Sequence, residues 1–253
     1  MTLQPVRAFG VDAAILFADI LLPAIPLGVG LEFAKGEGPV LQNPVRTMDD
    51  VRALKPVNAE TDLGYVMEAI RILRRELTDT ALIGFCGAPF TVASYIIEGG
   101  SSREFLKTKT MMYSAPDVFH ALMDKLADVF SDYLTAQIRA GAQAVQVFDS
   151  WVGALSPSDY EAFVLPYSQK LLKSAQAMNV PVIHFGTNTT TLLPLMKRAG
   201  GDVIGLDWRI PLDDGWSLLG DHVAVQGNLD PITLFAPLPE LKTRVHDVLR
   251  RAN

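Results

Sequence analysis

The chain has 253 residues, of which 49% are hydrophobic and 20% are charged, and its formal net charge is −6 at pH 7. This length and balance fit one large globular domain and leave enough apolar material for a core. The excess of acidic residues argues against broad affinity for nucleic acid, because phosphates need cations to neutralise them. We therefore expect a single domain over residues 1–253 that binds no nucleic acid.

A membrane span and an internal disulfide are both disfavoured. Residues 11–31 are apolar enough to suggest a membrane helix. Asp19 would then lie near mid-bilayer at a cost of about 2.5–3.5 kcal/mol, and Pro23 and Pro26 would break the helix. Cys86 is the single cysteine, so no internal disulfide is possible. We expect a chain that does not enter the membrane and works in the reducing cytoplasm.

Apolar runs and helical patterns alternate along the chain. The runs are apolar throughout, as in strands that are covered on both faces of a parallel sheet. Their alternation with helices indicates βαβ units. The predicted strands are 13–19, 82–88, 144–150, 181–186, 203–208 and 223–229.

Helix signals lie between these strands. Pro116 fits the first position of a helix over 116–140, which Gly141 follows. Ser101 and Glu104 have the spacing of a capping box. The other predicted helices are 61–77, 158–178 with Ser156 as N-cap, 189–198 and 239–251. The glycines of 28–31 and 35–38 resemble phosphate loops, but a β-hairpin across the mouth of a barrel is the preferred interpretation.

Six strands and about 250 residues favour a (β/α)8 TIM barrel, which normally has eight strands. The last predicted helix, 239–251, has no strand after it. We therefore expect an α/β TIM barrel that lacks its first and last strands. The alternative is an open, doubly wound sheet of six strands.

Five groups of segments then carry specific motifs in chain order. They are 17–21, 82–91 with 94–100, 142–150, 203–208 and 225–231. Gly-Phe-Cys-Gly-Ala-Pro-Phe-Thr within 82–91 and Gln-Gly-Asn-Leu-Asp-Pro within 225–231 are highly specific together. With these motifs in family order over nearly the whole length, the chain resembles the uroporphyrinogen decarboxylases.

The resemblance implies a dimeric, cofactor-free barrel with no bound metal. Members of this family convert uroporphyrinogen III to coproporphyrinogen III by removing four acetate carboxyls. Carried over by motif, Asp19 is the central catalytic group, which accepts hydrogen bonds from the pyrrole N–H groups and stabilises positive charge. Tyr95 and Ser150 contact substrate side chains. The family's Arg-Gln-Ala-Gly-Arg motif would belong upstream of Met1, and its Gly-His-Gly segment downstream of Asn253.

The chemistry explains why a carboxylate would be central. Loss of CO2 from a pyrrole acetate leaves a carbanion-like centre, which needs an electron sink. A protonated pyrrole ring supplies that sink, and a fixed carboxylate in a water-poor cleft stabilises the developing cation. Cations and a proton donor are needed as well.

Each candidate also has a structural interpretation. Asp19 can cap the turn after its strand, Tyr95 can be a core tyrosine with its hydroxyl in water, and Ser150 can be an N-cap. His184 is interpreted as a packed, hydrogen-bonded histidine in preference to a proton shuttle. The remaining strand-end acids, read as turn and cap residues, are Asp149, Asp207 and Asp230.

Two other functions compete with decarboxylation. One is a methyltransferase of the same superfamily, in which zinc activates a thiol. Zinc sites of this kind need clustered His and Cys ligands, and Cys86 has no His-X-Cys neighbour. The other is a tetrapyrrole-binding fragment that keeps the cleft without the chemistry.

Overall fold

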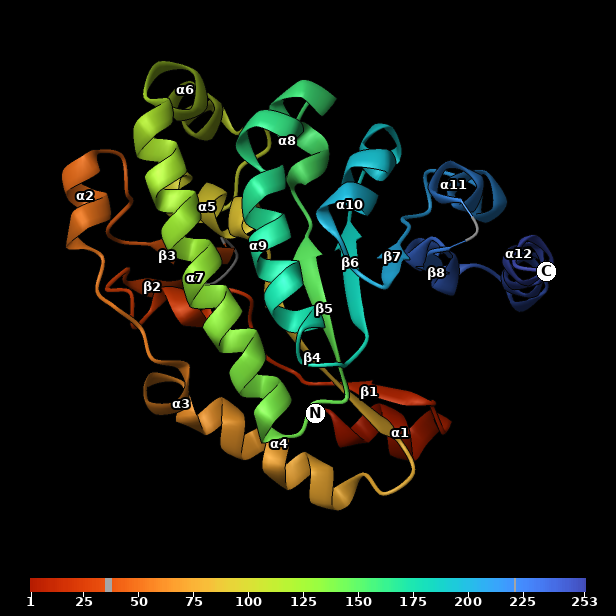
Figure 1. Ribbon diagram of the computed structural model, residues 1–253. Helices are drawn as coiled ribbons and strands as arrows, with labels where there is room; N and C mark the ends of the chain where they lie inside the picture. The colour runs from red at the N-terminus through yellow and green to blue at the C-terminus, as the bar shows by residue number, and fades with distance from the viewer. Residues whose placement is uncertain (35–37, 221) are drawn as a thin grey trace.

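The centre of the molecule is a sheet of six parallel strands (Figure 1). The computed structural model describes residues 1–34, 38–220 and 222–253. The strands are β1 (Ala13–Ile15), β4 (Ala81–Gly87), β5 (Ala144–Asp149), β6 (Val182–Gly186), β7 (Val203–Gly205) and β8 (Ala224–Gln226). They lie side by side in chain order. This order is that of a TIM barrel, whereas a doubly wound sheet reverses its order at a switch point. The predicted TIM-barrel-like fold is confirmed, and within the described residues the sheet stays open between β1 and β8.

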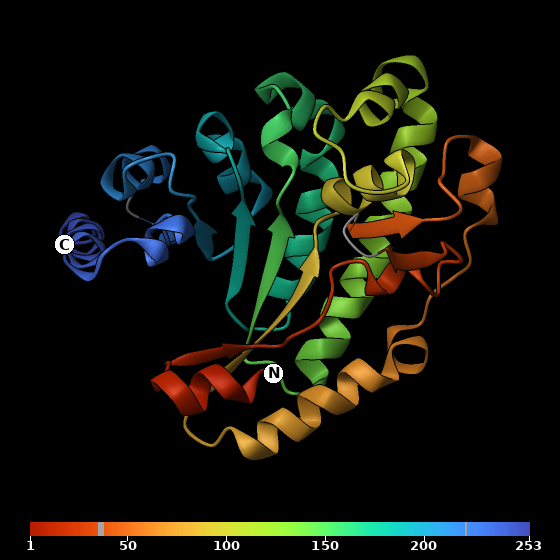
Figure 2. The same cartoon turned by 180° about the vertical axis from the view of Figure 1, so that it is seen from behind.

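Helices cover one face of this sheet. In Figure 1, α7 and α9 lie in front of the strands, and Figure 2 shows β4, β5 and β6 from behind with no helix in front of them. The helices are α1 (Leu3–Phe9), α2 (Met48–Ala53), α3 (Ala59–Asp62), α4 (Gly64–Glu76), α5 (Pro89–Glu98), α6 (Leu106–Ser114), α7 (Pro116–Ala140), α8 (Pro157–Phe163), α9 (Leu165–Gln176), α10 (Leu193–Ala199), α11 (Leu212–Leu219) and α12 (Leu238–Arg251). Short 3-10 turns are η1 (Leu22–Ala24), η2 (Val152–Ala154), η3 (Thr190–Leu192) and η4 (Pro231–Phe235). In the parts of the chain described above, no helix is long and apolar enough to cross a bilayer.

Most helix predictions are confirmed. Helix α7 has the predicted bounds, and the Ser156 hydroxyl accepts the Asp159 N–H as an N-cap. The predicted helix over 158–178 is divided at Val164 into α8 and α9. Pro166 stands in the first turn of α9, and its missing N–H prevents one continuous helix across this point.

The capping box predicted at residues 101–104 is wrong. Helix α6 begins only at Leu106, after that segment. The Glu98 carboxylate, at the end of α5, accepts both the backbone N–H and the hydroxyl of Thr108 at 2.9 Å. A residue from the preceding helix therefore performs the capping that the local spacing assigned to Glu104.

The predicted β-hairpin is present. Strands β2 (Leu31–Ala34) and β3 (Gly38–Leu41) pair antiparallel. Residues 35–37 of its glycine-containing loop lie outside the described residues. The hairpin adjoins the end of α5, because the Leu41 N–H donates to the Gly99 carbonyl at 3.0 Å.

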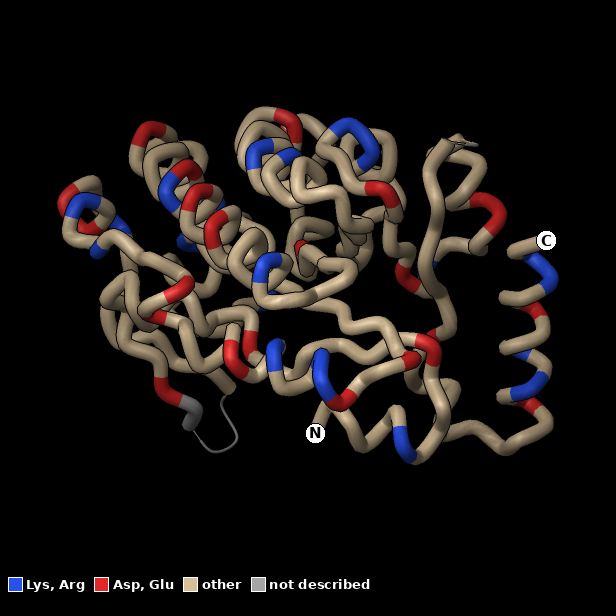
Figure 3. The backbone as a smooth tube through the Cα atoms, turned by 60° about the horizontal axis from the view of Figure 1, so that its bottom comes forward, with Lys and Arg blue, Asp and Glu red and all other residues tan. Residues whose placement is uncertain are grey.

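The two faces of the sheet differ in cover. Side chains toward the helices, including Leu82, Val145 and Val182, are fully buried. On the other face Ile15 is 41% exposed, and Phe17, two residues further along the chain, is 67% exposed. Charged residues lie along the outer helices, with both signs on α12 (Figure 3). The helix-covered face holds most of the core, whereas the opposite face is partly exposed and is most open near β1.

The side-chain amide of Gln137 pairs with the backbone of β4 beyond the point where β1 ends. The last residue of β1, Ile15, pairs with Ile83, so Phe85 lies beyond the ladder. There the Gln137 side chain from α7 accepts the Phe85 N–H at 2.9 Å and donates to the Phe85 carbonyl at 2.8 Å. Gln137 is fully buried, so water cannot replace these hydrogen bonds.

We predict that Gln137→Leu lowers the free energy of unfolding by about 2–4 kcal/mol, because both backbone groups of Phe85 lose their side-chain partner. Urea unfolding measures this change. Gln169→Leu is the matched control, since it removes only an exposed hydrogen bond to the Arg198 carbonyl and should cost less than about 0.5 kcal/mol. Equal losses in the two variants would contradict the structural role given to Gln137.

Candidate active site

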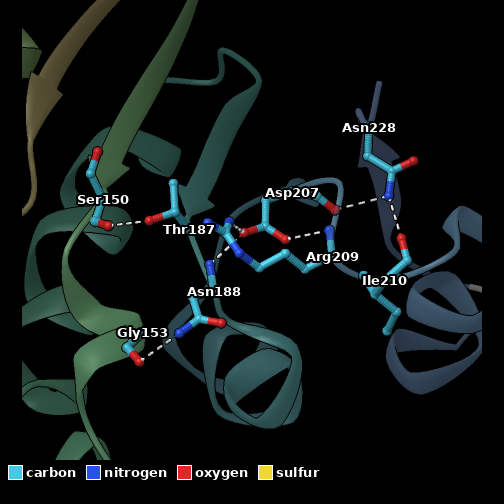
Figure 4. A network of polar contacts seen from close by, with 8 residues as sticks. All are labelled: Ser150, Gly153, Thr187, Asn188, Asp207, Arg209, Ile210 and Asn228. Carbon is cyan, nitrogen blue, oxygen red and sulfur yellow. Dashed lines mark hydrogen bonds and ion pairs between the residues drawn. The ribbon is translucent and has the colours of Figure 1, made fainter. Parts of the chain in front are cut away.

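The carboxyl ends of the parallel strands meet at one rim, and Asp207 lies at the centre of a polar network there (Figure 4). Its side chain follows β7 and is only 2% exposed. One carboxylate oxygen accepts the Asn188 N–H at 2.5 Å and also pairs with the Arg209 guanidinium at 2.5 Å. The other oxygen accepts the Arg209 N–H at 3.0 Å. Asp207 thus joins the loops after β6 and β7.

Asn228 extends this network to the loop after β8 (Figure 4). Its side-chain amide donates to the Asp207 carbonyl at 2.9 Å and to the Ile210 carbonyl at 2.6 Å. The loop after β8 is thereby tied to the loop after β7. Asn228 belongs to the Gln-Gly-Asn-Leu-Asp-Pro motif, so this part of the motif has a structural role.

The loop after β5 joins the network from the other side. The Thr187 hydroxyl donates to the Ser150 carbonyl, and the Asn188 side chain donates to the Gly153 carbonyl at 3.4 Å. A Cβ atom on Gly153 would lie 2.2 Å from the Thr187 carbonyl oxygen, so only glycine allows this close approach. The four loops after β5, β6, β7 and β8 therefore form one connected rim.

Asp19 follows β1 on the same end of the sheet and is half-buried. One carboxylate oxygen accepts the Leu21 N–H at 2.7 Å, so the turn contact of the structural interpretation is formed. Within the described residues the second oxygen makes no hydrogen bond. The turn contact holds the carboxylate in place through one of its two oxygens.

Tyr95 lies on α5 and shares its surroundings with Asp19 and Trp151. Its pKa is raised above the ordinary value by burial and, secondly, by the charge of Asp19. Its ring stacks on Trp151 with centroids 3.8 Å apart, and Phe105 contacts the same indole edge-on at 5.1 Å. The structure therefore stacks Tyr95 on the turn after β5, and the charge of Asp19 acts on its phenol.

Ser150 lies in that turn, directly before Trp151. The N-cap interpretation of Ser150 is wrong, because η2 begins one residue too late and Trp151 occupies the cap position. The backbone of Ser150 is held through its carbonyl by Thr187. Its hydroxyl forms no cap to η2, and the residue is half-buried.

The sequence did not predict a row of aromatic rings on the uncovered face. Phe148 packs edge-on against Phe85 at 5.6 Å and against Phe185 at 5.9 Å. A hollow of about 360 Å³ adjoins this row. It is lined in part by Gln146, Phe148, Phe185, Leu206, Asp207 and Gln226. Alternation within each strand was the available signal, but both faces of these strands are apolar and so do not reveal which face is open.

Asp149 and His184 lie on the helix-covered face, and both are fully buried. His184 is packed, as predicted, but neither ring nitrogen has a hydrogen-bond partner among the described residues, so its interpretation as a hydrogen-bonded histidine is wrong. Its Nε2 lies 3.9 Å from Asp149 Oδ2. Burial and the Asp149 carboxylate raise the pKa of both Cys86 and Tyr160. Asp149 is therefore a core group rather than a simple turn residue.

The other two acids behave as predicted, with one extension. Asp230 accepts the Ile232 N–H at 2.9 Å and caps η4. Asp207 also accepts backbone N–H groups, yet its ion pair with Arg209 makes it the centre of the rim network. Within residues 1–34, 38–220 and 222–253, no three His, Cys, Asp or Glu side chains are grouped so that they would hold a metal ion.

We predict that Asp19→Asn lowers the pKa of Tyr95 towards its ordinary value, because a nearby anion disfavours the tyrosinate form. The titration is followed by NMR of Cζ-labelled tyrosine, with the signal assigned in Tyr95→Phe. Asp202→Asn, at the amino end of β7, is the matched control and should leave the titration unchanged. An unchanged Tyr95 pKa in Asp19→Asn would mean that the two groups do not interact.

The comparisons with known proteins agree with this architecture. The family model described as "Uroporphyrinogen decarboxylase (URO-D)" matches residues 1–253. The chain is 56% identical over 253 residues to a uroporphyrinogen decarboxylase of Carboxydothermus hydrogenoformans, covering 100% of this chain and 72% of that protein. It is 54% identical over 250 residues to the Trichlorobacter lovleyi enzyme of the same name, with 98% and 73% covered.

Among solved structures, a methyltransferase from Methanosarcina mazei superposes with a TM-score of 0.85 over 99% of this chain and 74% of that chain. The two sequences are only 19% identical, so this likeness establishes the fold alone. The family model and the relatives above 50% identity establish the family as well as the fold. The chain belongs to the uroporphyrinogen decarboxylase family, and its function is that of a decarboxylase.

Proposed function

We propose that this chain removes the acetate carboxyls of uroporphyrinogen III, giving coproporphyrinogen III, with Asp19 as the group that stabilises positive charge on the substrate. The observation that carries the assignment is the half-buried Asp19 carboxylate, which is held through one oxygen by the Leu21 N–H and whose charge helps to raise the pKa of Tyr95. The relatives from Carboxydothermus hydrogenoformans and Trichlorobacter lovleyi are named for this activity, and the proposal assigns it to this chain as well.

The reaction needs a place for an electron pair. Protonation of a pyrrole ring carbon makes the ring cationic. The bond between the acetate CH2 and its carboxylate then breaks, its electron pair moves into the ring, and CO2 leaves. A second proton adds to the exocyclic carbon to form the methyl group, and the ring loses the first proton. The net change is one acetate carboxylate and one proton converted to a methyl group and CO2.

Asp19 acts on the cationic ring in this sequence. The oxygen that makes no hydrogen bond within the described residues is proposed to accept pyrrole N–H groups, which become more acidic when the ring is protonated. The turn contact to Leu21 fixes the carboxylate before substrate arrives, so little reorganisation is needed during the reaction. The Asp19 charge then stabilises the transition state more than the neutral substrate.

The aromatic row offers a surface for the macrocycle. A tetrapyrrole is broad and apolar at its centre, and the half-buried rings of Phe148 and Phe185 present apolar area on the uncovered face, with the buried Phe85 packed edge-on behind Phe148. Tyr95 and Ser150 are proposed to contact substrate side chains from the rim. A tyrosine phenol is protonated at neutral pH and can donate to a carboxylate, and the raised pKa of Tyr95 favours this form further.

The methyltransferase alternative is not favoured, because the relatives above 50% identity carry the decarboxylase name whereas the methyltransferase likeness is one of fold. The binding-only alternative predicts a chain that retains the tetrapyrrole without releasing CO2. We also propose a cytoplasmic homodimer that binds neither nucleic acid nor membrane. The net charge of −6, the single cysteine and the family resemblance support this assignment.

We predict that Asp19→Asn lowers the decarboxylation rate by about 10²–10³-fold, because the amide keeps the turn acceptor but removes the charge. The purified chain is incubated anaerobically with uroporphyrinogen III, and the products are separated by their number of carboxyl groups.

Asp202→Asn serves as the control, since Asp202 accepts the Val182 N–H at the opposite end of the sheet and should retain the rate. Equal losses in the two variants would remove Asp19 from the reaction. A wild-type chain that binds uroporphyrinogen but forms no product would support the binding-only alternative.

A further inference from the structure

One hydroxyl joins helix α5 to the turn after β5. Thr91 is the third residue of α5, and its Oγ1 donates to Asp149 Oδ1 at 3.1 Å. The same oxygen accepts the Trp151 N–H at 3.2 Å. A hydroxyl donates and accepts at once, so Thr91 uses both capacities in bridging the two residues that flank Ser150.

Burial makes this bridge hard to replace. Thr91 and Asp149 are both fully buried, so water does not reach the hydroxyl to take over either hydrogen bond. Loss of the hydroxyl would leave the Trp151 N–H and Asp149 Oδ1 without this partner. The turn would then have to move to satisfy them.

Trp151 carries the effect of that bridge to the site. Its indole stacks on Tyr95, which is four residues after Thr91 and so lies on the same side of α5. Phe105 contacts the indole as well. Helix α5 therefore contacts Trp151 in two ways: the Thr91 hydroxyl binds its backbone N–H, and the Tyr95 ring stacks on its indole.

We infer that Thr91 is a positioning residue, whose hydroxyl fixes the Asp149–Trp151 turn and thereby sets Ser150 and the Tyr95–Trp151 stack for substrate. Thr91 acts through these neighbours and is itself enclosed beneath them. The Ser150 carbonyl accepts a hydrogen bond from the Thr187 hydroxyl. The residues directly before and after Ser150, Asp149 and Trp151, are both hydrogen-bonded to Thr91. Only the measurement of kcat/KM rests on the proposed function, because the spectroscopic and exchange measurements need no substrate.

Two variants separate the hydroxyl from the shape of the side chain. Thr91→Val keeps the volume and removes both hydrogen bonds, whereas Thr91→Ser keeps the hydroxyl and removes a methyl group. We expect kcat/KM for uroporphyrinogen to fall by about 10- to 100-fold in Thr91→Val, as a misplaced contact typically costs. Thr91→Ser should stay within about threefold of wild type.

Two readouts are independent of any substrate. Near-ultraviolet circular dichroism reports the Tyr95–Trp151 stack, in a background where Trp208 and Trp216 are replaced by Phe. The stacking signal should be lost in Thr91→Val and retained in Thr91→Ser. Amide hydrogen exchange in the unaltered chain should show the Trp151 N–H protected by about 100-fold, because its acceptor is buried.

The outcomes separate this inference from the proposed function. A folded Thr91→Val chain with the wild-type stacking signal and kcat/KM overturns the inference. So does a Thr91→Ser chain that loses the signal as fully as Thr91→Val. If Thr91→Val does not fold, rapid exchange of the Trp151 N–H in the unaltered chain overturns it, and protection with an intact Thr91→Ser signal supports it. If the unaltered chain has no decarboxylase activity, the proposed function fails. The spectroscopic and exchange results then still decide whether Thr91 positions the turn.

Discussion

The common direction of six neighbouring strands is the constraint on which the rest of this structure depends. Because every strand runs the same way, each loop that follows a strand emerges at one rim. Asp19 comes from the loop after β1, Tyr95 from the helix after β4, and Ser150 from the turn after β5. Residues more than 130 positions apart in the chain are thereby placed at one end of the sheet.

Those loops are irregular, and polar side chains fix them. Asp207 and Asn228 join the loops after β6, β7 and β8, and Thr91 fastens the turn after β5 to α5. Each of these links satisfies backbone groups that no strand or helix pairs. The rim is therefore shaped by a few side chains, while the apolar face under the helices supplies the bulk of the core.

The sequence predicted the regular elements well, because burial on both sides leaves long apolar runs and helices leave clear end signals. All six strands and the bounds of α7 follow from such patterns, although β1, β7 and β8 end three or four residues before the ends predicted for 13–19, 203–208 and 223–229. The failures concern contacts between distant segments. Glu98 caps a helix that local spacing assigned to Glu104, and Pro166 divides a helix whose apolar pattern is continuous.

The candidate site shows the same division. Motifs indicated Asp19, Tyr95 and Ser150, but nothing local announces the bridge at Thr91 or the stacking of Tyr95 on Trp151. His184 was expected to find hydrogen bonds, whereas the structure surrounds it with none from the described residues. Such features depend on which face of a strand meets which helix, and this requires the assembled sheet.

We propose that the tetrapyrrole lies on the uncovered face with its nitrogens at Asp19. The most direct test is a crystal structure of this chain with coproporphyrinogen bound under anaerobic conditions. We expect pyrrole nitrogens within hydrogen-bond distance of the Asp19 carboxylate and the macrocycle against Phe148 and Phe185. A macrocycle bound elsewhere, or one whose nitrogens point away from Asp19, would contradict it.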